Sequence, residues 1–133
     1  MSSLLRNRVV VGGEMRFRAW HKPLRELAYH TLRFLTSRGS LALFLVQDDV
    51  MKKNVLAFPS VEGFPRPAMP NPFLGEVYVN PDYVRRHGES LDYMVIHGVL
   101  HLAGYVHETT RDRIRMERIE EKILKFLRSR TSA

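Results

Sequence analysis

The chain has 133 residues, of which 44% are hydrophobic and 26% charged, and its formal net charge is +7. This length predicts one domain, residues 1–133, with a single packed core. The absence of cysteine excludes disulfides and thiolate metal ligands. No apolar run reaches about 18 residues, and residues 1–8 lack the apolar stretch of a signal peptide, so we expect a cytoplasmic protein without a membrane span.

Positive charge is concentrated at the two ends of the chain. Residues 1–38 hold eight Arg or Lys against two Glu, and residues 111–133 hold eight against four acidic residues. Residues 39–110, by contrast, carry a net charge of −3. This asymmetry indicates a polyanionic partner such as nucleic acid, although the solvated helix faces of any basic protein give the same pattern.

The residue pattern in the first half of the chain predicts strands before and after one helix. Residues 9–11 and 15–19 form a short strand or hairpin with Gly12 and Gly13 at its turn. Pro23 suits the first turn of a helix that ends near residue 37. Residues 41–46 and 54–58 follow as strands. The apolar stripe of the helix comprises Leu24, Leu27, Ala28, Thr31, Leu32 and Leu35.

A proline-rich segment separates the two halves. Five of the seven prolines lie within residues 59–72, which predicts an extended surface loop. Residues 59–74 are long for a simple connection, so the loop either borders a functional cleft or crosses the surface passively. Residues 75–80 then alternate between apolar and polar side chains, as a half-buried strand does.

The second half is mainly helical. Asn80 caps a short helix, Ser90 caps a second one that Gly104 ends, and Thr109 caps a last helix reaching about residue 128. The mixed order of elements predicts an α+β fold, with a small mixed sheet of about four strands packed against helices. The expected core stripe of the last helix is Ile114, Ile119, Ile123, Phe126 and Leu127.

Three histidines indicate a metal site at the end of the central helix. His97 and His101 are four residues apart and therefore share one helix face. Gly104 can adopt a positive φ and return His107 toward the same point. Three imidazoles with one open position are the ligand set of a catalytic zinc site, although copper, nickel and iron also accept imidazole. We therefore predict one Zn²⁺ ion.

Zinc in such a site suits hydrolysis, because it lowers the pKa of water and polarises phosphoryl or carbonyl oxygens. The histidine spacing is also that of metzincin-like proteases, which carry a general-base Glu directly after the first His. Gly98 occupies that position here and cannot accept a proton. The three histidines therefore indicate a metal-dependent hydrolase, and Gly98 argues against a peptidase.

Residues 97–107 read His-Gly-Val-Leu-His-Leu-Ala-Gly-Tyr-Val-His. This segment resembles the YbeY family of metal-dependent endoribonucleases and ribosomal RNA maturation factors, whose signature is His-Gly-x-Leu-His-Leu-x-Gly-Tyr-Asp-His. Ten of the eleven places match when the two variable ones are counted, and Val106 is the departure. Residues 55–59 and 75–79 are similar to two family strands. Met116 and Glu120 fall where the family carries a Met and a Glu in its last helix.

The resemblance implies a zinc-dependent endoribonuclease that matures ribosomal RNA near the 3′ end of the small subunit and serves ribosome quality control. The implied partners are ribosomal RNA, the small ribosomal subunit and its assembly factors. The chain departs from the family at one further place. The family has an Arg before the strand at residues 55–59, whereas this chain has only Lys52 and Lys53 there.

We expect those two lysines to stabilise phosphate charge less well than an Arg, because Lys cannot grip phosphate in a bidentate way. The chain should then be a slow nuclease, with a non-cleaving RNA-binding assembly factor as the alternative. RNA binding should depend on both basic ends and fall steeply with salt. The cations concerned are Arg6, Arg8, Arg16, Arg18, Arg111, Arg115, Arg118 and Lys122.

Overall fold

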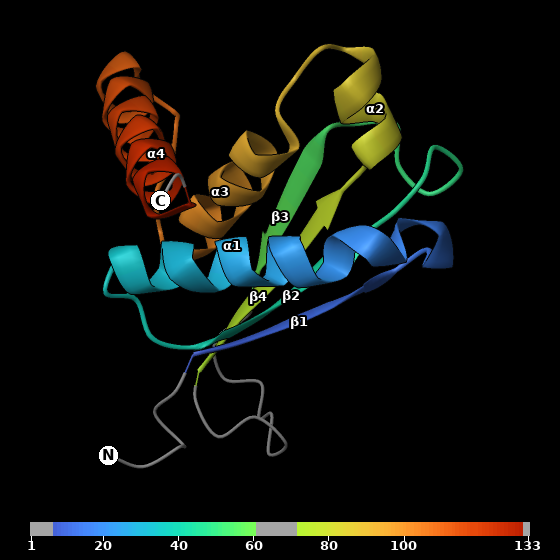
Figure 1. The fold of residues 1–133 in the computed structure, drawn as a ribbon. Helices are drawn as coiled ribbons and strands as arrows, with labels where there is room; N and C mark the ends of the chain where they lie inside the picture. The colour runs from blue at the N-terminus through green and yellow to red at the C-terminus, as the bar shows by residue number, and fades with distance from the viewer. Residues whose placement is uncertain (1–6, 61–71, 132–133) are drawn as a thin grey trace.

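Four strands form one mixed sheet in the computed structural model, which describes residues 7–60 and 72–131. The strand order is β1-β2-β4-β3. β1 (Arg8–Gly13), β2 (Ser40–Leu45) and β4 (Phe73–Val79) run parallel, and β3 (Val55–Pro59) lies antiparallel beside β4 at the edge. The predicted α+β class with a small mixed sheet is confirmed (Figure 1).

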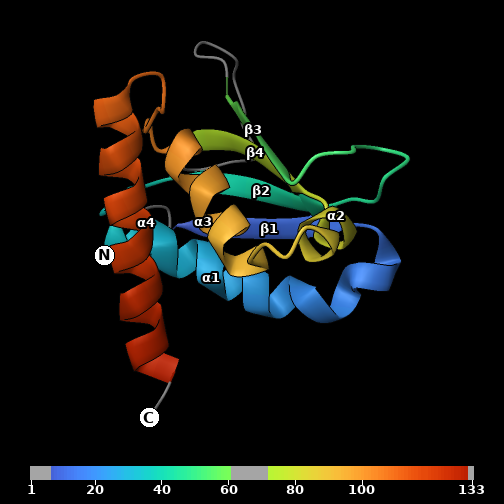
Figure 2. The same cartoon turned by 90° about the horizontal axis from the view of Figure 1, so that it is seen from above.

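Helices cover one face of this sheet. α1 and α3 pack on the sheet and on each other, whereas α4 lies against α3 and α1 (Figure 2). Within the described ranges, no helix has both the length and the apolar character that crossing a bilayer requires. The helical elements are η2 (Met15–Trp20), α1 (His21–Phe34), α2 (Pro81–Arg86), α3 (Leu91–Leu102) and α4 (Thr110–Thr131).

The core lies between the sheet and the pair α1 and α3. Alternate residues of β2 and β4 point toward the helices, because successive side chains of a strand face opposite sides. α1 and α3 contribute residues spaced three or four apart, which share one helix face. The buried residues of this layer include Leu24, Ala28, Leu32, Leu41, Leu43, Leu45, Val77, Val79, Val95 and Val99.

Predicted helix boundaries are confirmed by side-chain caps. The Asn80 Oδ1 accepts from the Tyr83 backbone N–H at 3.0 Å. Ser90 Oγ likewise accepts from the Tyr93 N–H at 3.2 Å and opens α3. Gly104 has φ of 101°, a left-handed conformation that ends the helix as expected.

The expected strand or hairpin at residues 9–19 is wrong in its second half. β1 forms, but it pairs in parallel with β2. Residues 15–20 are a 3-10 helix, η2, in which Phe17 is buried and its N–H donates to the Glu14 carbonyl at 3.0 Å. The physical reason is that β2 satisfies the backbone hydrogen bonds of β1 and that Phe17 is buried in the core. Residues 15–20 therefore do not return as a second strand.

The expected core stripe of α4 is also partly wrong. Ile123 is buried as predicted, but Ile114 and Phe126 are 43% and 40% exposed. The row of α4 that faces α3 instead includes Met116 and Glu120, both 1% exposed. α4 touches the rest of the molecule along one face, so Ile114 remains partly exposed, and Phe126 packs at its edge against Phe34 with the ring centroids 5.5 Å apart.

Candidate metal centre

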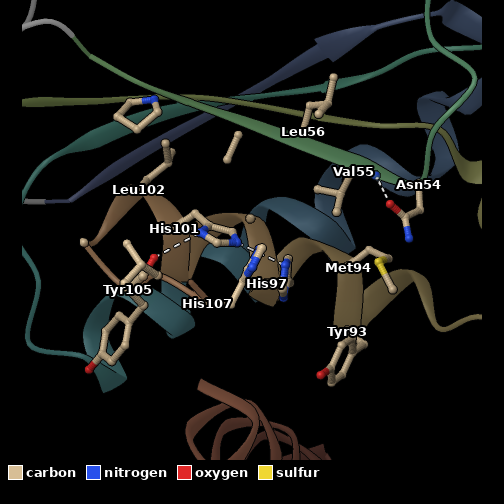
Figure 3. A pocket seen from close by; sticks show the side chains of 15 residues that line it. Asn54, Val55, Leu56, Tyr93, Met94, His97, His101, Leu102, Tyr105 and His107 are labelled. Carbon is tan, nitrogen blue, oxygen red and sulfur yellow. Dashed lines mark hydrogen bonds between the residues drawn. The ribbon is translucent and has the colours of Figure 1, made fainter. Parts of the chain in front are cut away.

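α3 and the turn after it bring three imidazoles together. His97 and His101 lie one helical turn apart on the same face of α3, and His107 follows the turn at Gly104. The Tyr105 N–H donates to the Leu100 carbonyl at 3.0 Å, which folds the chain back toward the helix. One ring nitrogen from each histidine lies within 4.8 Å of the others, and Figure 3 shows the three rings turned toward one point.

A backbone carbonyl determines the tautomer of His101. The His101 Nδ1 lies 3.0 Å from the Tyr105 carbonyl oxygen. A carbonyl only accepts, so Nδ1 carries the proton and Nε2 presents a lone pair. Burial, followed by the neighbouring His97 and His107, lowers the pKa of His101 below its ordinary value of 6.5. The neutral imidazole that a metal requires is therefore the favoured form.

A buried carboxylate orients His97 in the same way. The His97 Nδ1 lies 2.6 Å from Glu120 Oε2, and the Tyr93 hydroxyl donates to Glu120 Oε1 at 2.5 Å. The carboxylate thus receives one hydrogen bond on each oxygen although it is 1% exposed. With Nδ1 directed to the carboxylate, Nε2 is the ring nitrogen of His97 that faces the other histidines.

The Nε2 atoms of His97 and His101 face each other. They are 3.1 Å apart, and which of them donates depends on the tautomers of the two rings. A metal ion binds the lone pair of each neutral ring and takes the place of this contact. Two nitrogens bound at about 2.0–2.1 Å to one tetrahedral ion would be about 3.3 Å apart, so the observed spacing fits a metal. The exposed His107 supplies the third nitrogen.

The histidines lie in a cavity of about 710 Å³ between α3 and the edge strand β3. Val55, Leu56 and Ala57 of β3 form one wall, and Pro59 lies at its end. Residues 61–71, most of the predicted proline-rich loop, fall outside the described residues, so only Pro59 supports the expectation that this loop borders the cleft. The walls are mainly apolar apart from the imidazoles.

Neither predicted lysine lines this cavity. Lys52 and Lys53 are exposed in the connection between β2 and β3, next to Asn54, which does line it. The charge of Lys52 acts on Asp48, as one of the smaller contributions that lower the pKa of that carboxyl after the hydrogen bonds from Arg86 and Asn80. Among the cavity-lining residues that the structure describes, none is an Arg or Lys.

Gly98 has a packing role. A Cβ at this position would lie 2.5 Å from Val77 Cγ1 and 3.3 Å from Val55 Cγ2, so no larger side chain fits without displacement. The direct contact brings α3 close to β3 and β4. Metzincin-like proteases carry their general-base glutamate at this position. A glutamate here would clash with the sheet.

The three histidines were visible in the sequence, whereas their supporting residues were only partly so. Glu120 was singled out by resemblance alone, and Tyr93 and the Tyr105 carbonyl were missed. Two signals could have identified the side chains. Tyr93 stands four residues before His97 on the same helix face, and Glu120 interrupts the apolar row between Met116 and Ile123.

These features define a small α+β protein with a three-histidine cluster in a cavity beside an edge strand. The family model described as Endoribonuclease YbeY matches residues 46–128, and the chain belongs to the YbeY family. Proteins named Endoribonuclease YbeY from Bartonella henselae and Thermodesulfovibrio yellowstonii are 38% and 37% identical to it over 84 residues. Each match covers 56% of this chain and 51% of the relative, so the chain spans about half the length of the curated relatives it matches.

The fold is also similar to a solved structure. The solution structure of TM1509 from Thermotoga maritima superimposes with a TM-score of 0.56 at 23% sequence identity. The match covers 93% of this chain and 94% of that one. At 23% identity the similarity concerns the fold alone. The similar region also includes residues before 46, where the family match begins.

Proposed function

We propose that this chain is a metal-dependent endoribonuclease that hydrolyses phosphodiester bonds in ribosomal RNA, near the 3′ end of the small subunit and in ribosome quality control. The observation that carries the proposal is the pair of facing Nε2 atoms of His97 and His101, 3.1 Å apart, with His107 beside them. The matched relatives, named as endoribonucleases, supply the reaction class. The small ribosomal subunit and its assembly factors in the cytoplasm are the corresponding partners.

Zinc is the metal we propose, held by His97, His101 and His107. When bound, it supplies a Lewis acid for a phosphoryl oxygen and lowers the pKa of water, as hydrolysis at neutral pH requires. Glu120 and the Tyr105 carbonyl orient His97 and His101, and burial favours the neutral form of His101. We propose that Lys52 and Lys53 contribute positive charge from the β3 side of the cavity mouth.

The test combines metal content with cleavage. Wild type and the His97→Ala, His101→Ala and His107→Ala variants are dialysed against zinc and analysed for bound metal, with the exposed His87→Ala as the matched control. We expect one zinc per chain in wild type and control, and loss in the other three. Equal metal content in all five samples would refute the site.

The same proteins are then incubated with a structured RNA fragment from the 3′ end of small-subunit ribosomal RNA. Wild type and His87→Ala should cleave it, and His101→Ala should not. Cleavage that persists undiminished in His101→Ala would come from a contaminating nuclease and would remove the support for the assignment.

The second candidate function is a ribosome-assembly factor that binds RNA without cutting it. It is favoured by the absence of Arg and Lys among the described residues lining the cavity, because a phosphodiester transition state needs positive charge at its oxygens. Loss of one such group commonly lowers the rate about 10²–10³-fold, so we expect a slow nuclease.

Arginine substitutions separate the two functions. In a slow nuclease, Lys52→Arg or Lys53→Arg should raise cleavage while zinc content stays unchanged, because Arg can contact phosphate in a bidentate way. A non-cleaving factor should show no zinc-dependent cleavage in any of these proteins, and its affinity for RNA should be the same in wild type and His101→Ala.

A further inference from the structure

A row of cations runs along the exposed side of α4. Arg111, Arg115, Arg118 and Lys122 are spaced four, three and four residues apart, which places them on one helix face. We call these four residues the α4 basic row. All four are exposed, and within the described parts of the chain no ion pair involves any of them.

The acidic residues of α4 lie off this row. At about 100° per residue, which follows from 3.6 residues per turn, the four cations fall within a sector of about 60°. Asp112, Glu117, Glu120 and Glu121 all fall outside that sector. The row therefore presents uncompensated positive charge along a length of roughly 16 Å, given a rise of 1.5 Å per residue.

Depressions in the surface join this row to the metal cavity. The turn at Gly104, Tyr105 and Val106 lines both the cavity and a neighbouring depression of about 230 Å³, which Asp112 and Arg115 of α4 also line. Arg115 also lines a groove of about 580 Å³ that includes the other three cations of the row. These shared residues make the path continuous from His107 to Lys122.

Apolar surface is interleaved with the cations along this path. Val106 and Ile114 are 46% and 43% exposed, and the Arg115 guanidinium lies 5.2 Å above the Tyr105 ring. Positive charge alternating with aromatic and apolar side chains is typical of surfaces that bind single-stranded nucleic acid. Cations follow the phosphates there while the apolar groups receive the bases.

Cations near the N-terminus lack this connection. Arg16 of η2 forms an ion pair with Asp82 of α2 and donates to Gln47 at 2.9 Å. η2 lies at the opposite end of the molecule from α4 (Figures 1 and 2). η2 and its cations therefore do not share a surface with the α4 basic row, and no residue of η2 lines the metal cavity.

We propose that Tyr105 and the α4 basic row form a track that leads single-stranded RNA to the metal centre. The proposal rests on the proposed nuclease function and adds the path that the RNA follows to the histidines. The RNA enters along α4, crosses the Tyr105–Arg115 contact and reaches the histidines by way of the turn at Val106.

Two charge-matched triple variants test the track. One carries Arg111→Gln, Arg118→Gln and Lys122→Gln. The control carries Lys22→Gln, Arg25→Gln and Arg85→Gln, which remove the same charge from exposed positions of α1 and α2. The zinc-loaded full chain is titrated against a fluorescent oligouridylate of about 12 nucleotides, within the site sizes of single-strand binders. Anisotropy is read from about 50 to about 200 mM salt, and a gel verifies intact RNA.

We expect the α4 variant to bind at least tenfold more weakly than wild type, while the control stays close to wild type. Loss of three phosphate contacts should also reduce the slope of log affinity against log salt by about 2, since each contact on a single strand contributes about 0.7. A single Arg115→Gln variant should weaken binding as well, because this residue joins the two depressions.

Four outcomes would overturn the track. An equal loss of RNA affinity in both triple variants would indicate a general charge effect. Unchanged RNA affinity in the α4 variant would indicate that the α4 basic row binds a protein partner instead. Tighter binding of a duplex of the same length would exclude a single strand, and a wild type that binds no oligouridylate would exclude the track altogether. In each case zinc-dependent cleavage by wild type, abolished in His101→Ala, shows separately whether the nuclease function stands.

Discussion

Glu120 is a carboxylate within the buried face of α4, and its contacts explain its presence there. Burying a carboxylate is costly unless hydrogen bonds compensate for the lost water. Here the Tyr93 hydroxyl and the His97 Nδ1–H each donate to one of its oxygens. A carboxylate behind a ligand histidine holds the ring orientation and makes the opposite nitrogen a better donor to a metal. Glu120 is thus a positioning residue for His97.

Glu120→Gln should lower the affinity for zinc by about 10–100-fold, the usual effect of removing a group that supports a ligand. Glutamine preserves the size of the side chain but not its charge. The measurement is a competition titration with a chromophoric chelator. Glu121→Gln, an exposed neighbour on the same helix, is the matched control and should bind zinc like wild type. Equal affinities in the two variants would show that His97 does not depend on the carboxylate.

Tyr93→Phe should lower the free energy of unfolding by about 1–3 kcal/mol, because it leaves one oxygen of a buried carboxylate without a donor. Burial, followed by the hydrogen bond to Glu120, raises the pKa of Tyr93, so the phenol keeps its proton at neutral pH. Urea denaturation measures the change. Tyr83→Phe, which removes a hydroxyl on α2, should have a smaller effect, and a Tyr93→Phe protein as stable as wild type would contradict the assigned role of this bond.

At the scale of elements, α3 carries two of the three histidines and rests directly on the sheet at Gly98. The close approach depends on the missing side chain, because a Cβ would meet Val77 at 2.5 Å. It also brings the His97 and His101 face of α3 beside β3, whose residues form the wall of the cavity. Helix-to-sheet packing therefore decides the width of the site.

Gly98→Ala should destabilise the protein. Overpacking a core costs about 1–3 kcal/mol, which exceeds the gain of about 1 kcal/mol that alanine brings to a helix over glycine. Val77→Ala should destabilise it too, by creating a cavity at the same contact. The double variant should lose less stability than the sum of the two single ones. Additive losses in chemical denaturation would show that the two positions do not interact.

At the scale of the whole molecule, two groups with lowered pKa values couple stability to pH in separate ranges. His101 is neutral in the fold chiefly because of burial. Asp48, held by hydrogen bonds from Arg86 and Asn80, has a pKa below its ordinary 3.8. In both cases the unfolded chain binds the proton more readily than the folded one, so acid favours unfolding.

The metal-free protein should lose stability as the pH falls from about 6.5 toward the lower pKa of folded His101, since the unfolded chain takes up a proton that the fold resists. Asp48 should add a further loss only below pH 3.8. Unfolding free energies measured between pH 8 and 4 should show the first loss in wild type and a smaller one in His101→Gln. An identical pH dependence in the two proteins would contradict the lowered pKa of His101.

The sequence by itself determined the local features: the helix caps at Asn80 and Ser90, the helix-ending Gly104, and the histidines it brings together. These follow from hydrogen bonds and spacings within a few residues, which a short segment satisfies on its own. Only the tertiary structure decided that Glu120 reaches His97 from 23 residues away in the chain. It also decided that β1 pairs with β2, and that the basic row of α4 adjoins the cavity. The reason is that contacts between distant segments depend on how whole helices and strands pack together. The spacing of apolar residues within one helix or strand does not determine which other element it packs against.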